Sequence, residues 1–151
     1  MKPFKRILVP TDFSVYSTNA TLVALDLAER YAGTITLVHV SNPLALGMAD
    51  GFAASADERE GLREECEQEL ATARTNAGKV SAVGVETRLL TGDPATTICE
   101  FARRGYDLIV MPTHGRSGVA SVLMGSVAEQ VMRLAPCPVL TIRLANPAKT
   151  G

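Results

Sequence analysis

One stretch of the chain gathers side chains that suit phosphate chemistry: VMPTHGRSGVASVLMGSVAEQV, which runs from Val110 to Val131. A glycine-bearing loop that leads into a helix N-terminus favours an anion, because unpaired N–H groups and the helix dipole both point toward it. Glycine leaves room for a close backbone approach, hydroxyls can donate hydrogen bonds, and arginine can pair with phosphate oxygens. The residues concerned are Gly115, Gly118, Gly125, Ser117, Ser121, Ser126 and Arg116. The stretch therefore predicts a phosphate site between an apolar strand and an amphipathic helix.

Several of the polar residues also have a purely structural interpretation. Ser126 and Glu129 fit the S-x-x-E capping box, so Ser126 could serve only its own helix. Asp12, which follows the first apolar run, suits a helix N-cap as well as a ligand contact. His114 has no visible carboxylate partner, which favours a solvated histidine or a plain donor over an acid or base. His39 lies in an apolar run and is interpreted as an interior histidine with satisfied hydrogen bonds.

The elements that must position these residues follow from apolar periodicity and from turn and cap residues. Apolar runs predict strands over 6–10, 34–40, 83–90, 106–111 and 137–143, and helical spacing predicts helices over 20–31, 57–76, 94–104 and 123–134. Gly33 is expected to close the first helix, and Asp93 and Pro94 to begin the third. Strict alternation of strand and helix predicts an α/β fold with an open parallel sheet and helices on both faces. We expect one domain over residues 1–151, with a flexible tail at 145–151.

In such a sheet, ligands bind beyond the carboxyl ends of the strands, where the strand order reverses. The ends of the first and fourth predicted strands carry PTDFS and MPTHGRSG. If these two strands are neighbours, Asp12 faces the loop of Gly115 across a crevice.

Composition limits the class of protein. The 151 residues carry a formal net charge of −1, which favours neither nucleic acid nor an anionic membrane as partner. The three cysteines lie far apart without a CxxC motif, so a disulfide framework or a cysteine zinc site is not expected. The apolar run ILV is too short for a signal peptide and no later run reaches the length of a membrane span. We expect a cytoplasmic protein without a metal centre.

Six stretches run through the chain in the order ILVPTDFS, LVHV, GDPATTI, YDLIVMPTHGRSG, GSVAEQVM and CPVLTIR. In these stretches and their separations, the whole chain resembles the universal stress protein family. Members that bind nucleotides carry the motif G-x2-G-x9-G-[ST]. Gly115, Gly125 and Ser126 match its second glycine, third glycine and hydroxyl, whereas Pro112 replaces its first glycine.

The resemblance implies a five-stranded, Rossmann-like parallel sheet of order 3-2-1-4-5 and a site for ATP or AMP, with or without Mg²⁺. Asp12 would lie against the adenosine, the backbone of Val40 would meet the adenine edge, Met111 would line the pocket, and the glycine loop would hold the phosphates. The full set of expected nucleotide-binding residues is Pro10, Thr11, Asp12, Val40, Met111, Pro112, His114, Gly115, Arg116, Gly118, Gly125, Ser126 and Val127. The resemblance also implies a homodimer joined through the last strand, 138–143. Residues 42–56 lack a clear period, and we expect them to form a lid on the adenine side.

The leading hypothesis is a nucleotide-binding module that acts in the stress response by changing partners, through a protein partner that the sequence does not name. Pro112 should weaken binding, because proline removes an N–H donor and adds a ring at the mouth of the crevice. Two alternatives stay open. One is slow ATP hydrolysis or autophosphorylation on Ser117, Ser121 or Ser126, although Asp12 is the sole acidic residue in the motif loops. The other is a dimeric scaffold that works without nucleotide.

Overall fold

The computed structural model describes residues 2–42, 54–115 and 124–144. Strands and helices alternate along this part of the chain as predicted, with ends that differ by a few residues. They are β1 (Arg6–Pro10), α1 (Val15–Tyr31), β2 (Thr34–Ser41), α3 (Ala56–Val80), β3 (Val85–Thr91), α4 (Pro94–Ala102), β4 (Leu108–Pro112), α5 (Ser126–Leu134) and β5 (Val139–Ile142). Most of the predicted lid, 43–53, and the predicted flexible tail, 145–151, lie outside the described residues.

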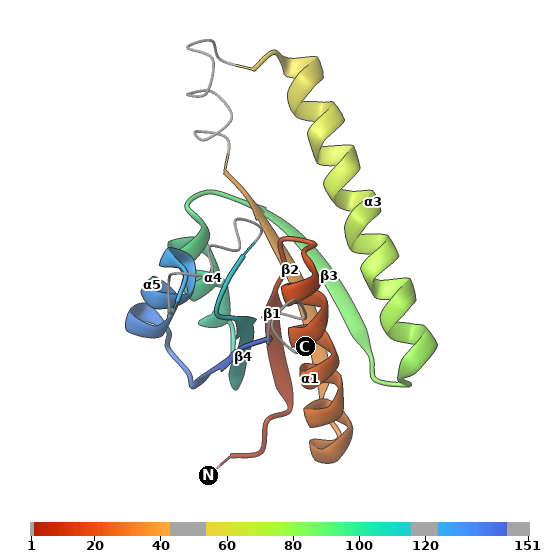
Figure 1. The fold of residues 1–151 in the computed structure, drawn as a ribbon, viewed down its shortest axis with the longest axis vertical. Helices are drawn as coiled ribbons and strands as arrows, with labels where there is room; N and C mark the ends of the chain where they lie inside the picture. The colour runs from red at the N-terminus through yellow and green to blue at the C-terminus, as the bar shows by residue number, and fades with distance from the viewer. Residues whose placement is uncertain (1, 43–53, 116–123, 145–151) are drawn as a thin grey trace, which may run out of the picture.

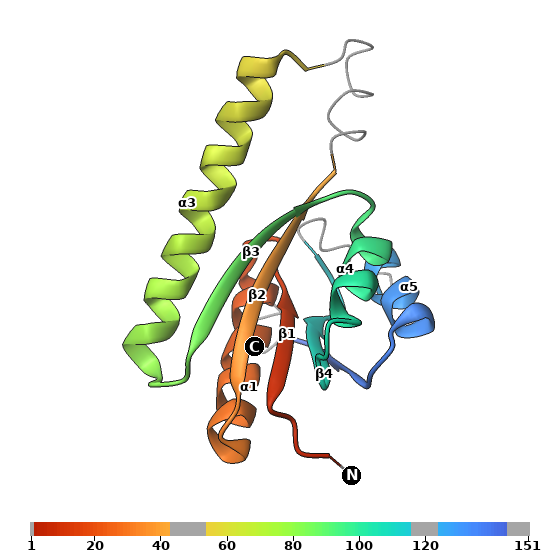
Figure 2. The same ribbon diagram turned by 180° about the vertical axis from the view of Figure 1, so that it is seen from behind.

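The strands form one parallel sheet in the order β3-β2-β1-β4-β5, which confirms the predicted order (Figures 1 and 2). β1 lies in the middle, with Ile7 opposite Ile35 of β2 on one side and opposite Leu108 of β4 on the other. The chain therefore turns back at the β1–β4 boundary, and this boundary is the switch point at which an open α/β sheet binds its ligands.

Two apolar layers cover the sheet. Alternate residues of a strand point to opposite faces, so Ile7 and Val9 of β1 pack with α1 and α3, while Leu8 packs with α4 and α5. All three side chains are fully buried. Burial of the central strands on both faces explains their nearly continuous apolar sequences.

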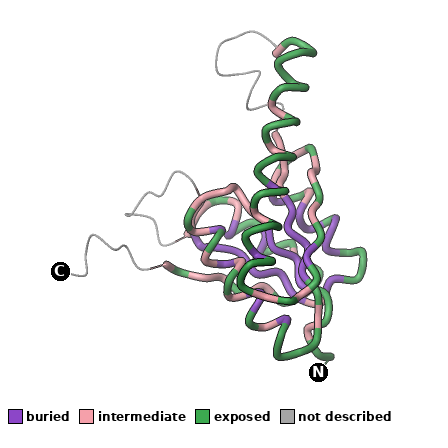
Figure 3. Tube along the Cα trace, turned by 90° about the vertical axis from the view of Figure 1, so that its right-hand side faces the viewer, coloured by how far each residue is buried: buried purple, intermediate pink, exposed green. Residues whose placement is uncertain are grey.

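Helix α3 extends beyond the sheet that it covers. Figure 3 shows exposed turns of α3 reaching well past the buried strands. The predicted stripe on this helix is confirmed, since Leu70 is buried and Leu62 and Cys66 are half-buried, while most residues around them are exposed. A capping box of Ser55 and Glu58 fixes the start of the helix.

The end of α1 differs from the expectation for Gly33. Ala32, rather than the glycine, adopts the left-handed conformation that terminates the helix, with φ of 51°. Gly33 serves a different purpose, because a Cβ at this position would lie 2.7 Å from the carbonyl oxygen of Lys5. The glycine thus permits the chain to pass close to the segment before β1.

Among the described residues, no helix combines the length and apolar character needed to cross a membrane.

Candidate functional site

Two prolines lie at the switch point, where β1 and β4 end. Pro10 ends β1 and Pro112 ends β4, and the paired residues of these strands are limited to Ile7 with Leu108 and Leu8 with Ile109. The N–H of Thr11 donates to Val38 of β2, and the N–H of Thr113 donates to Ile142 of β5. N–H groups alternate between the two sides of a strand, so the nitrogens of residues 10 and 112 both face the gap between β1 and β4.

Proline has no N–H, and neither nitrogen can donate across this gap. The paired residues of β1 and β4 end at Leu8 and Ile109, and a crevice lies beyond them. The described residues enclose a cavity of about 250 Å³ there, slightly below the roughly 300–1,000 Å³ typical of small-molecule sites.

Every predicted site residue that the structure describes lines this cavity. These residues are Pro10, Thr11, Asp12, Val40, Met111, Pro112, His114, Gly115, Gly125, Ser126 and Val127. Arg116 and Gly118, together with Ser117 and Ser121, lie outside the described residues. The strand ends and the turn before α5 thus meet at one place, as the switch-point argument expected.

Part of the cavity lining was not predicted from the sequence. Ser17 and Thr113 are buried polar residues beside the predicted ones, and Val38 and Ala128 complete the apolar wall together with Pro94 and Ile98 of α4. The spacing of residues along the sequence could have indicated some of these lining residues. Val38 lies on the same face of β2 as Val40, and Pro94 and Ile98 are one helical turn apart.

Asp12 is held in a fixed orientation by the start of α1. Its Oδ1 accepts hydrogen bonds from the N–H of Ser14 at 3.0 Å and from the hydroxyl of Ser17 at 2.7 Å. The N-cap of α1 is Ser14, whose side chain accepts from the N–H of Ser17, so the interpretation of Asp12 as N-cap is wrong. The chain makes one more turn before the helix begins, which leaves the Asp12 carboxylate beside the crevice.

The carboxylate of Asp12 faces Gly115, as predicted for neighbouring first and fourth strands. A Cβ built on Gly115 would lie 2.8 Å from Oδ2 of Asp12. A side chain at position 115 would therefore have to displace either the Asp12 carboxylate or the loop.

The turn between Asp12 and α1 contains a strained residue. Phe13 has φ of 65°, a conformation that bulky residues rarely adopt, and its ring lies on the ring of His39 with centroids 4.6 Å apart. His39 donates its Nδ1–H to the carbonyl oxygen of Thr11 at 2.7 Å, which fixes the tautomer because a carbonyl can only accept. The histidine is satisfied as predicted, although it is half-buried rather than interior.

The start of α5 forms the other side of the crevice. Gly125 is the N-cap, and its N–H donates to the carbonyl oxygen of Thr113 at 2.6 Å. Ser126 is the first helical residue and no side chain caps this helix, so the predicted capping box of Ser126 and Glu129 is wrong. The first N–H groups of α5 have no partner within the helix, and Ser126 and Val127 at its start line the crevice.

Charge at the described part of the site is sparse. Its titratable lining residues are Asp12, His39 and His114, and the Nδ1 of His114 lies 3.0 Å from the hydroxyl oxygen of Thr113 in a hydrogen bond. Within the described ranges, no group of three or more histidine, cysteine or acidic side chains could hold a metal ion. These residues therefore offer one carboxylate, hydroxyls and backbone donors to a ligand.

Comparison with known proteins identifies relatives over nearly the whole chain. The model of the universal stress protein family matches residues 3–143. A universal stress protein of Methanocaldococcus jannaschii is 35% identical over 143 residues, which cover 93% of this chain and 82% of the relative. The solved structure of another protein from that organism has a TM-score of 0.84 at 27% identity, and the match covers 96% of this chain and 99% of the other.

Three more distant solved structures share the fold and were determined with an adenine nucleotide. One is a universal stress protein in complex with cAMP, with a TM-score of 0.70, 23% identity, and 94% of this chain and 98% of that chain covered. The Archaeoglobus fulgidus protein with dAMP has a TM-score of 0.68 at 22% identity, covering 93% and 99%. The Arabidopsis thaliana protein with AMP has a TM-score of 0.63 at 22% identity, covering 97% and 96%.

Proposed function

Because this chain belongs to the universal stress protein family, we propose that it is an adenine-nucleotide-binding module that holds ATP or AMP in the crevice between β1 and β4. One observation carries the proposal. At the switch point, opposite the N-terminus of α5, hydrogen bonds hold the Asp12 carboxylate so that it faces Gly115, which has no side chain. The nucleotide complexes of proteins with the same fold support it. We further propose that the protein acts in the cytoplasm by changing partners rather than by catalysis.

The ligand would lie across the switch point. Its adenine would meet the backbone of Val40 and its adenosine the carboxylate of Asp12, with Met111 against the base. The phosphates would lie over Gly115 and the first turn of α5, where the N–H groups of Ser126 and Val127 and the helix dipole favour an anion. Arg116 is proposed as their cationic partner.

Pro112 is proposed to weaken this binding. Its nitrogen faces the gap between β1 and β4, where a glycine would present an N–H to the ligand. Loss of a hydrogen bond to a charged oxygen costs about 1.5–3 kcal/mol, which corresponds to a loss of affinity of roughly ten- to a hundredfold.

Calorimetric titration of AMP and ATP tests both statements. The native protein should bind weakly, Pro112→Gly should bind roughly ten- to a hundredfold more tightly, and Gly125→Val should not bind. Pro112→Ala is the matched control, because it restores the N–H but keeps a side chain, and so separates the lost donor from the bulk of the ring. Absence of binding in every variant would favour a dimeric scaffold that works without nucleotide.

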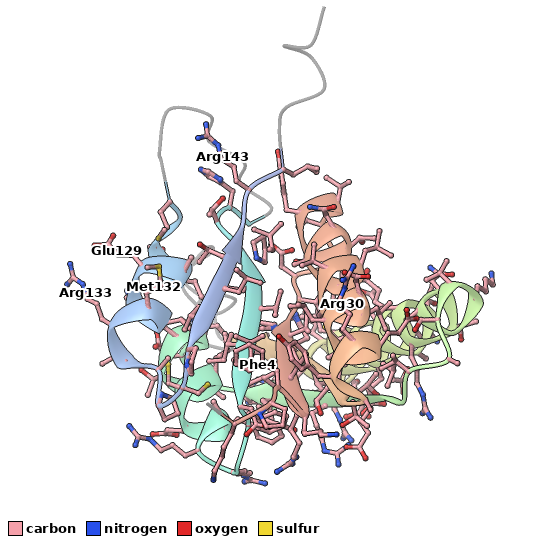
Figure 4. The ribbon with its side chains drawn as sticks, turned by 90° about the horizontal axis from the view of Figure 1, so that it is seen from below. Phe4, Arg30, Glu129, Met132, Arg133 and Arg143 are labelled. Atoms are coloured by element: carbon pink, nitrogen blue, oxygen red, sulfur yellow. The ribbon has the colours of Figure 1, made fainter. Side chains whose placement is uncertain are left out.

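We also propose that two copies associate through β5, which is an edge strand of the sheet. Leu140 of β5 is 38% exposed and Met132 of α5 is 49% exposed. Seen from below in Figure 4, Arg143 marks the end of β5, and Met132 lies on the neighbouring helix. An exposed apolar edge of this kind favours strand pairing.

The edge can be tested without damage to the sheet. The carbonyl groups of Pro138 and Ile142 accept from β4, so the backbone of Thr141 faces the open edge. Thr141→Pro removes one outward N–H donor and should weaken association, so the average mass measured in sedimentation should shift from the dimer toward the monomer. An unchanged dimer affinity in this variant would place the interface elsewhere.

A further inference from the structure

A second cavity lies between α1 and α3, on the face of the sheet opposite α4 and α5. Its volume is about 640 Å³, and Thr11 is the sole described residue that lines both this groove and the crevice. The groove is therefore a separate site. Along α3 its lining runs from Glu65 to Val80, a length of about 22 Å at 1.5 Å per residue.

The floor of this α1/α3 groove is apolar. Phe13, Leu25 and Ala77 line it, and the last two are nearly fully buried. Leu22 on α1 and Val80 at the end of α3 flank the floor and are 49% and 64% exposed. Large apolar side chains exposed beside an apolar floor are typical of a surface that docks a partner.

The α3 wall of the groove is acidic at one end. Glu65 and Glu69 are one helical turn apart and both line the groove, whereas none of its described lining residues is lysine or arginine. A partner that fits must therefore combine an apolar face with positive charge.

We propose that the α1/α3 groove binds a basic amphipathic helix of a partner protein. A helix of about 15 residues matches the groove in length, and its apolar side chains at i, i+3, i+4 and i+7 would lie on the floor. Lysine or arginine beside that stripe would lie at the acidic end of the wall and pair with Glu65. A compact small molecule would leave much of a groove of this length unfilled. The proposal does not depend on nucleotide binding in the crevice.

The test uses fluorescein-labelled peptides of 16 residues with leucine at helical spacing and zero, two, four or six lysines on the flanking positions. Fluorescence anisotropy should show binding to the full chain that tightens as lysines are added and weakens as salt is added. The double variant Glu65→Gln/Glu69→Gln should lose at least tenfold in affinity, and Leu22→Ser should lose about fivefold.

The matched control is Glu64→Gln/Glu67→Gln, which changes net charge equally at exposed positions of α3 outside the groove. It should bind the peptides within twofold of the native chain. NMR shift changes on peptide binding should gather at Leu22, Leu25 and Ala77 rather than at Met111. Equal losses in the two double variants, shift changes at the crevice, or no binding by any peptide would overturn the proposal. Conversion of a dimer to a monomer by Glu65→Gln/Glu69→Gln would also overturn it, by showing that a second copy occupies the groove.

Discussion

Substitution of Gly115 by alanine tests whether the pairing of Asp12 with the β4 loop organises the crevice. The added Cβ would lie 2.8 Å from Oδ2 of Asp12, and the two atoms must separate by about 0.6 Å to reach an ordinary contact of 3.4 Å. Asp12 cannot move freely, because its other oxygen is held by Ser14 and Ser17. Either a hydrogen bond to the carboxylate breaks or the loop shifts away from it.

A broken hydrogen bond to a charged group costs about 1.5–3 kcal/mol. We therefore expect Gly115→Ala to lower the free energy of unfolding in urea by about that amount, and to lower AMP affinity in calorimetry at least about tenfold. In an Asp12→Ala background the carboxylate that the new Cβ would meet is absent. Gly115→Ala should then lower the free energy of unfolding by less than about 0.5 kcal/mol. Gly84→Ala is the control, since its Cβ would make only an ordinary 3.4 Å contact. If Gly115→Ala costs the same with and without the Asp12 carboxylate, the reasoning is refuted.

Three further predictions concern packing and thiol chemistry. Gly33→Ala should lower the free energy of unfolding by about 1–3 kcal/mol because its Cβ meets backbone at 2.7 Å, whereas Gly61→Ala, in open space on α3, should raise it by about 0.5–1 kcal/mol; urea titration measures both. Tyr106→Phe leaves the buried hydroxyl of Thr36 without its 2.9 Å partner and should cost about 1–3 kcal/mol in the same assay, and an equal cost when Thr36 is valine would contradict this. Burial, and then the neighbouring carboxylate of Asp107, raise the pKa of Cys137, so iodoacetamide should label it more slowly in the folded protein than in urea. The stability linked to this thiol should be complete below its ordinary pKa and be lost as pH rises through the raised value; equal labelling rates in both states would argue against burial.

Local sequence patterns predicted the elements well but not their contacts across the fold. Apolar strands such as LIVM and caps such as Asp93 with Pro94 are encoded by neighbouring residues. The strand order came from the family resemblance, because alternation alone does not specify which strands are adjacent.

The errors arise where a distant backbone decides a local structure. The S-x-x-E pattern at Ser126 failed because the N–H of Gly125 bonds to Thr113, which places glycine at the N-cap and serine inside the helix. Gly33 is required by the backbone of Phe4 and Lys5, which lie before β1 and are separated from Gly33 in the sequence by β1 and α1. Ser17 was missed as a site residue because its role is visible only once its hydroxyl meets Asp12.

The two prolines at the switch point lead to a last prediction about the amide at position 112. Were β1 and β4 to continue in register, an N–H at 112 would donate to the carbonyl of Pro10, and this rung would narrow the crevice. The end of β1 is instead held away from β4, because the N–H of Thr11 bonds to Val38 of β2 and Asp12 is anchored to α1. We therefore expect the restored N–H in Pro112→Gly to remain open to solvent until nucleotide arrives.

Amide exchange followed by NMR distinguishes the two arrangements. In Pro112→Gly without ligand, the new amide at position 112 should exchange quickly, and saturating AMP should slow it at least tenfold. The amide of Thr113, which bonds to Ile142, is the internal control and should be protected in both states. If the new amide is protected before AMP is added, and affinity is no better than in the native protein, the restored N–H closes the sheet. Pro112 would then serve to hold the crevice open, and it would not weaken the binding of the phosphates.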